Sequence, residues 1–330
     1  MKRHIFIPIL SLVVFGSLVV FGLSVGIPTV QAQTYPNRSV QLIIPCTPGS
    51  IIDITGRLLA DELGKILKQQ FVPINKPGGA FTVGTDFAAR AKKDGYTLVY
   101  TNNPAIIYGR ILSPESVHYD PDKDLEPLGL HVFFAHALAV QASSPWKTFR
   151  ELMDYAKSNP NKLRYSTPGI GSTSHFNLEI IQSLTGTHLT HVPFKSGEAV
   201  ITALLGGHVE ATFDAISKIA PHAKDGAMRM LLVTIKSPNY PTIPTIRELG
   251  YKQDLPISWF AMYAPSGMPE EVKKVLIPAI EKAVKNPELK AKIEKLEFVV
   301  DYRSPAELKK LAAEEYELAL ATAKKAGLAK

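Results

Sequence analysis

Apolar runs typical of buried strands alternate with stretches of helical periodicity, and this alternation constrains the fold more than any other feature of the sequence. The runs at 40–44, 163–166 and 188–192, for example, each precede a stretch with apolar residues at helical spacing. Strands and helices that alternate in this way form α/β folds with mostly parallel sheets. Because 330 residues exceed the usual size of one domain, the sequence predicts roughly two domains of this class.

The predicted elements cover most of the chain. Strands are expected at 40–44, 71–74, 96–100, 128–134, 137–141, 163–166, 188–192, 209–213, 228–235 and 259–264. Helices are expected at 53–67, 84–92, 148–157, 174–184 and 198–205, and from Pro269, Asn286 and Ser304 onward. Ser304 and Glu307 form a capping box for the last helix, whose predicted core face is Leu308, Leu311 and Leu318. Between 104 and 127 the periodicity is too weak to predict an element.

The start of the chain has the organisation of an export signal. A basic stretch, Lys2-Arg3-His4, precedes an apolar run over 5–27, and small residues follow at 30–32. We therefore predict a signal peptide at 1–32 and an exported mature chain. The apolar run is long for a signal peptide, so an uncleaved membrane anchor is the alternative.

The formal net charge of +7 does not indicate a nucleic-acid partner. Many lysines lie on predicted C-terminal helices beside glutamates, as at 290–295 and 309–310, which is typical of solvated helix faces. No aromatic-rich basic motif accompanies them. We predict no nucleic-acid binding, and the positive charge favours anionic ligands only weakly.

The segment from 40 to 57 reads as a buried strand, a turn and the start of a helix. Pro45 ends the strand, Pro48 and Gly49 form the turn, and the helix follows. The first N–H groups of a helix lack partners within the helix, and the helix dipole adds positive potential there. Such a helix start binds an anion without Lys or Arg. The alternative is an ordinary strand-to-helix connection.

A second segment has the same organisation. Strand residues 164–167 lead into the turn 168–171, and Ser172-Thr173-Ser174 supply caps for a helix starting near His175. The two segments come from separate halves of the chain. If their helix starts face each other across a cleft, they are expected to hold a carboxylate between them.

Enzyme signatures are weak. Gly169 and Gly171 match two-thirds of a dinucleotide-binding fingerprint, but Ser174 occupies the third glycine position. The nucleophile elbow G-x-S-x-G is absent from the predicted mature chain, residues 33–330. His188 and His191 are three residues apart on a predicted strand, so their side chains point to opposite faces and are not expected to chelate a metal. We predict no enzyme activity, no cofactor and no metal.

Several single residues allow two interpretations. His131 and His136 lack neighbouring acids or cysteines, so core or surface positions are favoured for them, whereas His175 is expected near a site. Cys46, the only cysteine, is interpreted as a small buried hydrophobic residue, with thiol chemistry as the alternative. Asp214 ends a strand, where it serves either as a helix cap or as a polar group at a cleft rim.

The order and spacing of many short motifs resemble the substrate-binding proteins of the tripartite tricarboxylate transporters, also called Bug-type receptors. The resemblance covers essentially the whole mature chain. The motifs are Tyr35-Pro36, the PxxPGxxxD pattern at 45–53, Asn75–Gly79, Lys93–Leu98, Gly169–His175, His191–Lys195, Leu204–Gly207 with Val209–Asp214, Pro244-Thr245 with Glu248–Gly250, and Ala264–Gly267.

This resemblance implies a periplasmic α/β protein with a two-domain Venus-flytrap fold. Domain I is then expected to comprise 33–133 and 255–330, and domain II 134–254. The expected function is the capture of a small carboxylate and its delivery to integral membrane transporter subunits by a monomeric receptor. The ligand-binding residues carried over are Thr47, Gly49, Ser50, Asp53, Gly169, Gly171, Ser172 and Thr173, with Asn102 and Asp214 as secondary candidates.

The chain departs from the family pattern in the first segment. Ser50 replaces a glycine, Ile51 and Ile52 replace smaller or polar residues, and Cys46 replaces an aromatic residue. If an isoleucine faces the cleft, an aromatic or aliphatic carboxylate is expected to bind better than citrate, because charges would otherwise face hydrocarbon. Two alternatives to the receptor are an exported α/β enzyme, such as a hydrolase or nucleotide-dependent enzyme, and a ligand-sensing module for a signalling partner.

Overall fold

Two mixed β-sheets organise the computed structural model, which describes residues 35–194, 197–237, 239–325 and 329. The first sheet has the order β11(Val299–Arg303)-β4(Leu125–Phe134)-β10(Ser258–Pro265)-β3(Thr97–Asn102)-β1(Val40–Ile44)-β2(Phe71–Asn75). The second sheet has the order β7(Thr190–Pro193)-β6(Arg164–Thr167)-β8(Ala211–Ala215)-β5(His136–Gln141)-β9(Met228–Val233). The predicted signal segment, 1–32, lies outside the described residues.

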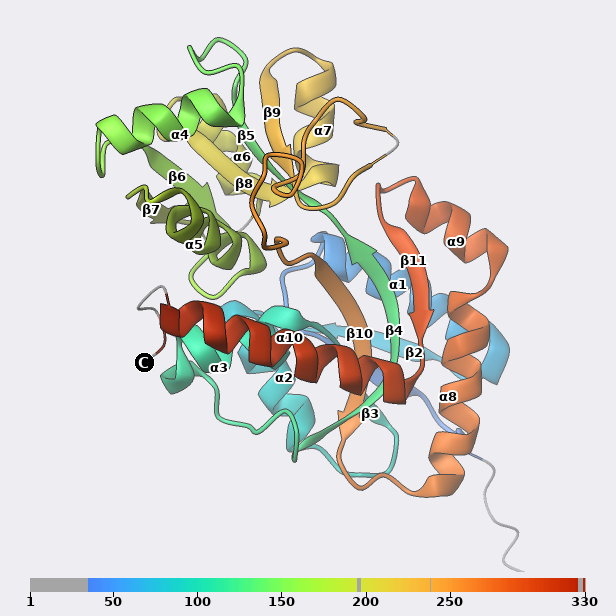
Figure 1. The fold of residues 1–330 in the computed structure, drawn as a ribbon. Helices are drawn as coiled ribbons and strands as arrows, with labels where there is room; N and C mark the ends of the chain where they lie inside the picture. Colours follow the sequence, from blue (N-terminus) through green and yellow to red (C-terminus); the bar gives the residue numbers. More distant parts are fainter. Residues whose placement is uncertain (1–34, 195–196, 238, 326–328, 330) are drawn as a thin grey trace, which may run out of the picture. The chain divides into compact units, whose positions relative to one another are not determined.

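Ten α-helices of the described part accompany the sheets (Figure 1). They are α1(Ile51–Leu67), α2(Thr82–Ala89), α3(Gly109–Leu112), α4(Phe149–Ser158), α5(Thr173–Thr185), α6(Gly197–Leu205), α7(Ile216–Lys224), α8(Glu270–Val284), α9(Pro287–Glu294) and α10(Pro305–Lys325). Short 3-10 turns at Gly79–Phe81 and Pro114–Ser116 and a π-helical turn at Pro104–Tyr108 complete the described elements.

The α/β class and the mixed sheets confirm the predicted fold, but the sheets are not mostly parallel. In the first sheet β1 pairs in parallel with β2 and β3, whereas the pairs of β10 with β3 and β4 and of β11 with β4 are antiparallel. The second sheet divides its pairings equally between the two types. The reason is that the two strands by which the chain crosses between the sheets, β5 and β10, are each antiparallel to both of their neighbours.

Helix starts follow the predicted capping signals. Thr148 accepts from the N–H of Glu151, 3.2 Å away, and Asn286 accepts from that of Glu288, 2.8 Å away. At α10 the N–H of Ser304 donates to the Glu307 carboxylate at 2.8 Å, and the N–H of Glu307 donates back to the Ser304 hydroxyl at 3.4 Å. The predicted capping box is therefore confirmed.

The predicted core face of α10 is partly wrong. Leu308 is fully buried, but Leu318 is 52% exposed. The buried stripe follows Leu308, Ala312, Ala319 and Ala323, with Glu315 between them at the matching helical positions. Small residues on this stripe let the helix pack closely, and they carry a weaker hydrophobic signal than the leucines beside it.

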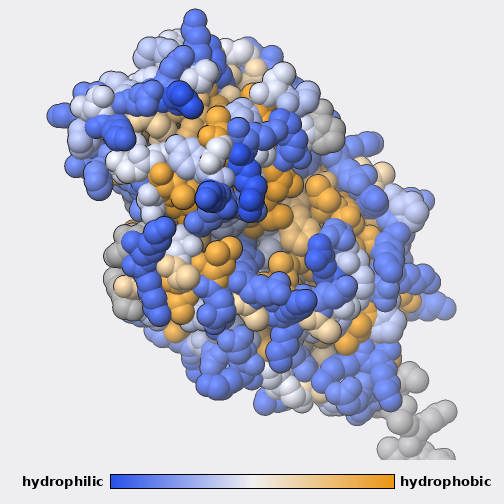
Figure 2. Space-filling model, in the orientation of Figure 1, coloured by the Kyte–Doolittle hydropathy of each residue, from blue (hydrophilic) through white to orange (hydrophobic). Residues whose placement is uncertain are grey.

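The central strands of the first sheet are almost entirely buried. β1 is buried at four of its five positions, and β10 is buried at every position, as expected for strands covered on both faces. On the face drawn in Figure 2, hydrophilic residues dominate the periphery and hydrophobic residues gather toward the middle. Within the described residues, none of the helices combines the length and hydrophobicity needed to span a bilayer.

Candidate functional site

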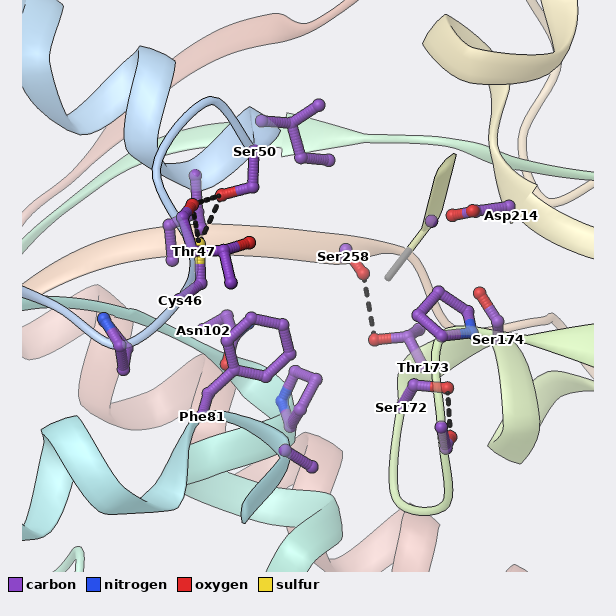
Figure 3. A pocket seen from close by; sticks show the side chains of 18 of the residues that line it. Cys46, Thr47, Ser50, Phe81, Asn102, Ser172, Thr173, Ser174, Asp214 and Ser258 are labelled. Carbon is purple, nitrogen blue, oxygen red and sulfur yellow. Dashed lines mark hydrogen bonds between the residues drawn. The ribbon is translucent and has the colours of Figure 1, made fainter. Parts of the chain in front are cut away.

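A cavity of about 670 Å³ lies where the two predicted anion-binding segments meet. Figure 3 shows Thr47 and Ser50 on one side of it, Ser172, Thr173 and Ser174 on the other, and Ser258 between them. Seven of the predicted ligand-binding residues line this cavity: Thr47, Ser50, Asn102, Gly169, Ser172, Thr173 and Asp214. Gly49, Asp53 and Gly171 lie beside it and are not among the described lining residues.

Asp53 shapes the turn before α1. Its carboxylate accepts from the N–H of Gly49 at 2.8 Å, from Asn75 Nδ2 at 2.8 Å and from Arg57 Nε at 2.9 Å. Burial opposes ionisation, but the hydrogen bonds from Arg57, Gly49 and Asn75 outweigh it and lower the pKa of Asp53. Gly49 has φ of 81°, which suits glycine. Both residues thus position the turn.

The N-terminus of α1 lacks a side-chain cap among the described residues. The hydroxyl of Ser50 donates instead to the Thr47 carbonyl at 2.9 Å. The hydroxyl of Thr47 lines the cavity and has no hydrogen-bond partner in the described part of the chain. First-turn N–H groups that Ser50 does not cap, and a hydroxyl without a partner among the described residues, therefore lie at this wall, where an anion can accept hydrogen bonds from them.

Ser172 caps the N-terminus of α5. Its hydroxyl accepts from the N–H of His175 at 3.1 Å and donates to the Gly169 carbonyl at 2.8 Å. The N–H of Gly171 donates to His175 Nδ1 at 3.4 Å, so His175 supports the turn from outside the cavity. The one hydroxyl proton of Ser172 is thus already committed within the loop. Ser174, by contrast, lines the cavity with a hydroxyl that has no partner among the described residues.

Ser172→Ala and Ser174→Ala are therefore expected to have different effects. Loss of the cap in Ser172→Ala should lower the free energy of unfolding by about 0.5–2 kcal/mol and weaken binding indirectly. Ser174→Ala should leave stability nearly unchanged but weaken carboxylate binding about tenfold to a hundredfold, because it removes a free donor. Urea denaturation and calorimetric titration measure the two effects. Equal loss of stability in both variants would contradict this assignment.

The floor of the cavity joins both sheets through a chain of hydrogen bonds. Ser258 Oγ donates to Thr173 Oγ1 at 2.8 Å, and Thr173 Oγ1 donates to Asn103 Oδ1 at 3.5 Å. Because the single proton of Ser258 is used, its oxygen accepts from His136 Nε2, 3.3 Å away. Burial lowers the pKa of His136 to about 3, so the imidazole is neutral at physiological pH.

A charged group that sequence reasoning missed reaches the cavity from α7. Lys218 lines it, and Lys218 Nζ lies 2.9 Å from Glu198 Oε1. Asp214 lies beside them; its Oδ1 accepts from the N–H of Ala215 at 2.7 Å, while its buried Oδ2 has no hydrogen-bond partner among the described residues. Burial raises the pKa of Asp214. Lys218 lies on α7, a helix that the sequence analysis did not predict, so Lys218 was not expected at the site.

The remaining wall is largely apolar. Cys46, Ile51 and Ile52 all line the cavity, together with Phe81 and Ile170. Cys46 is a buried free thiol, and burial raises its pKa to about 11, which leaves little thiolate at neutral pH. No group of three His, Cys, Asp or Glu residues within the described ranges is arranged to hold a metal ion.

Comparisons with known proteins place the chain in a family of receptors. The model of the tripartite tricarboxylate transporter family receptor matches residues 55–328. A UPF0065 protein of Cupriavidus necator is 33% identical over 91% of each chain. The structure of R. palustris Rpa4515 with adipate is 29% identical, with a TM-score of 0.82 over 89% of this chain and 99% of that one. The periplasmic binding protein BugD is 27% identical, with a TM-score of 0.80 over 90% of this chain and 100% of that one.

These matches cover most of the chain, and the structural matches are proteins with the two-domain fold of periplasmic binding proteins. The family consists of solute receptors, which are not enzymes. The chain belongs to the tripartite tricarboxylate transporter receptor family and is a Bug-type solute receptor.

Proposed function

We propose that this receptor captures a small carboxylate in the cavity and delivers it to the membrane subunits of a tripartite tricarboxylate-type transporter. The observation that carries the proposal is the meeting of two helix N-termini, α1 and α5, at one cavity, with the first of them uncapped. The adipate bound to the similar R. palustris protein supports a carboxylate as the ligand class.

The ligand contacts are assigned to hydrogen-bond donors at the cavity that have no partner among the described residues. We assign the carboxylate to the N–H groups of the first turn of α1 and to the hydroxyls of Thr47 and Ser174. Ser50, Asn102, Gly169, Ser172 and Thr173 form the surrounding wall. Gly49, Asp53 and Gly171 act by positioning the two turns, because their hydrogen bonds hold the backbone.

The apolar wall selects the body of the ligand. Ile51 and Ile52 line the cavity, so a ligand body beyond the carboxylate buries apolar surface against them, worth about 25 cal/mol per Å². Citrate would place a charged carboxylate against this hydrocarbon. We therefore propose an aliphatic or aromatic carboxylate in preference to citrate.

The lobes, oligomeric state and export route are part of the proposal. We assign 33–133 and 255–330 to one lobe and 134–254 to the other, because the strands of the first sheet fall within 40–134 and 258–303 and those of the second within 136–233. We propose that the receptor is a monomer in the periplasm and that residues 1–32 direct its export.

A thermal-shift screen against carboxylates tests the function. A ligand at a hundredfold excess over Kd stabilises the folded state by about 2.7 kcal/mol, which raises the melting temperature. We expect aliphatic or aromatic acids to shift the melting temperature more than citrate does. If no carboxylate shifts it, the proposed function is wrong; if citrate gives the largest shift, the assignment of the ligand body is wrong.

A further inference from the structure

Lys218 is the only Lys or Arg among the described residues that line the cavity. Its side chain is 17% exposed, so the ammonium group is mostly withdrawn from bulk water while remaining at the cavity wall. A charge in such a place interacts with a bound anion more strongly than a surface charge does. The other charged or titratable residues described at the wall are Glu198 and Asp214, together with the neutral His136 and the Cys46 thiol.

Gly197 makes room for this ammonium group. A Cβ atom at position 197 would lie 1.9 Å from Lys218 Nζ and 2.9 Å from Asp214 Oδ2, both well inside normal contact distance. Lys218 therefore occupies the space that a side chain on residue 197 would fill, directly above the buried Asp214 carboxyl.

Glu198 is the present partner of Lys218, and it is easily replaced. The side chain of Glu198 is 67% exposed, whereas that of Lys218 is mostly buried. Ion pairs with an exposed partner contribute little stability, because water solvates the released carboxylate well. A carboxylate arriving from within the cavity can thus take the position of the Glu198 carboxylate at low cost.

We propose that Lys218 is a specificity-determining residue that binds a second carboxylate group of the ligand, and that Glu198 occupies this position in the ligand-free receptor. The inference rests on the proposed function, since it assumes that the first carboxylate binds at α1 and α5. It assigns the ligand to dicarboxylates with an apolar middle, which matches Ile51 and Ile52 between the two polar ends.

A cationic group is disfavoured at the same place. Asp214 Oδ2, which has no hydrogen-bond partner among the described residues, is the atom that would attract it, but this atom is buried beneath Gly197 and Lys218. A ligand ammonium group would therefore meet the lysine before it reached the acid. The contact available to a ligand on this wall is the ammonium of Lys218.

The test compares an unbranched dicarboxylate with the monocarboxylate of the same chain length by calorimetric titration. In the wild type, the dicarboxylate should bind about tenfold to a hundredfold more tightly, as expected for a hydrogen bond between charged groups. Lys218→Met should remove this preference, because it lowers the dicarboxylate affinity far more than the monocarboxylate affinity. Glu198→Gln should strengthen dicarboxylate binding, because it removes the competing carboxylate. Gly197→Ala should reduce the preference by displacing the ammonium group, and it provides a second test if Lys218→Met folds poorly.

Lys224→Met is the matched control, since Lys224 lies on the same helix, is largely exposed and pairs with Glu297 at 3.8 Å. It should leave both affinities unchanged. Equal affinity for the two acids in the wild type, or a preference that survives Lys218→Met, would overturn the inference while leaving the proposed function intact. Tighter binding of the corresponding ω-amino acid would overturn it in favour of cation recognition. Failure of every acid to bind would overturn both proposals.

Discussion

Replacing Glu315 by alanine is expected to lower the free energy of unfolding by about 3–5 kcal/mol. Glu315 lies on the buried stripe of α10, and its carboxylate accepts from Asn103 Nδ2 and from Trp259 Nε1, each at 2.8 Å, and from the hydroxyl of Tyr108. Alanine would leave the Tyr108 hydroxyl, Trp259 Nε1 and one N–H of Asn103 without this acceptor and open a cavity between the helix and β10. Asn103 Nδ2 would keep its bond to the Ile257 carbonyl, at 2.9 Å. Unsatisfied buried groups cost about 1–3 kcal/mol each, and the cost of the cavity adds to this.

Glu314→Ala is the matched control, because Glu314 is 66% exposed and its ion pair, with Lys310 at 3.8 Å, is on the surface. It should change stability by less than about 1 kcal/mol. Urea denaturation of both variants at neutral pH measures the difference. If Glu315→Ala lowers the free energy of unfolding by less than about 1 kcal/mol, Glu315 is not the acceptor for these buried donors.

The pH dependence of Glu315 has a defined sign. Burial raises its pKa, and this outweighs the hydrogen bonds from Tyr108, Trp259 and Asn103 that favour the carboxylate. A carboxyl whose pKa is raised by folding contributes stability below its unfolded pKa of about 4.3, and this contribution is lost as pH rises through the folded value. Wild type should therefore lose stability relative to Glu315→Gln as pH rises over that range.

Both turns that line the cavity could be predicted because their signals are local. A buried apolar strand, a proline or glycine turn and a polar residue before a helical period are all read from consecutive residues, as at 40–57 and 164–175. β1, α1, β6 and α5 were therefore expected close to their observed bounds. The same signals could not show that the two turns face one cavity, which depends on how the second sheet packs against the first.

Elements that depend on tertiary packing escaped prediction. Helix α7 contains Pro221 in its interior and has no side-chain cap among the described residues, so its local propensity is poor. It is stabilised by burial of Ile216, Ile219 and Ala220 against the second sheet. The helical turns within 104–112 and the edge strand β11 were missed for a similar reason. Missing α7 also meant missing Lys218.

Asp53 was predicted to bind the ligand but is found to hold the turn, and the reason for the difference is related. Its place in the family pattern made it a ligand-binding candidate, but the pattern does not distinguish a residue that contacts the ligand from one that holds the turn. The partners of the carboxylate do. Its oxygens accept from Gly49 in the turn, from Arg57 on α1 and from Asn75 on β2, so each contact holds the turn rather than a ligand.

Asp53→Ala is accordingly expected to destabilise the protein by about 2–4 kcal/mol, since it leaves the Gly49 N–H and Asn75 Nδ2 without their acceptor. Asn75 also donates to the Cys46 carbonyl at 3.1 Å, so the change loosens the start of the turn as well as its tip. Ligand affinity should fall with stability, because the N–H groups of α1 are no longer held toward the cavity. Calorimetric titration should show a reduced enthalpy with an added entropic cost of ordering the turn.

Asp86→Ala provides the control, because Asp86 makes the same i,i+4 pair with Arg90, also at 2.9 Å, on the surface of α2. This pair should contribute less than about 1 kcal/mol. The acid dependence separates the two sites further. Because folding lowers the pKa of Asp53, its contribution is fully present above the unfolded pKa of about 3.9 and is lost as pH falls through the lower folded value. The stability difference between wild type and Asp53→Ala should therefore shrink on acidification. A difference that stays constant down to that pH would show that the carboxylate does not hold the turn in its ionised form.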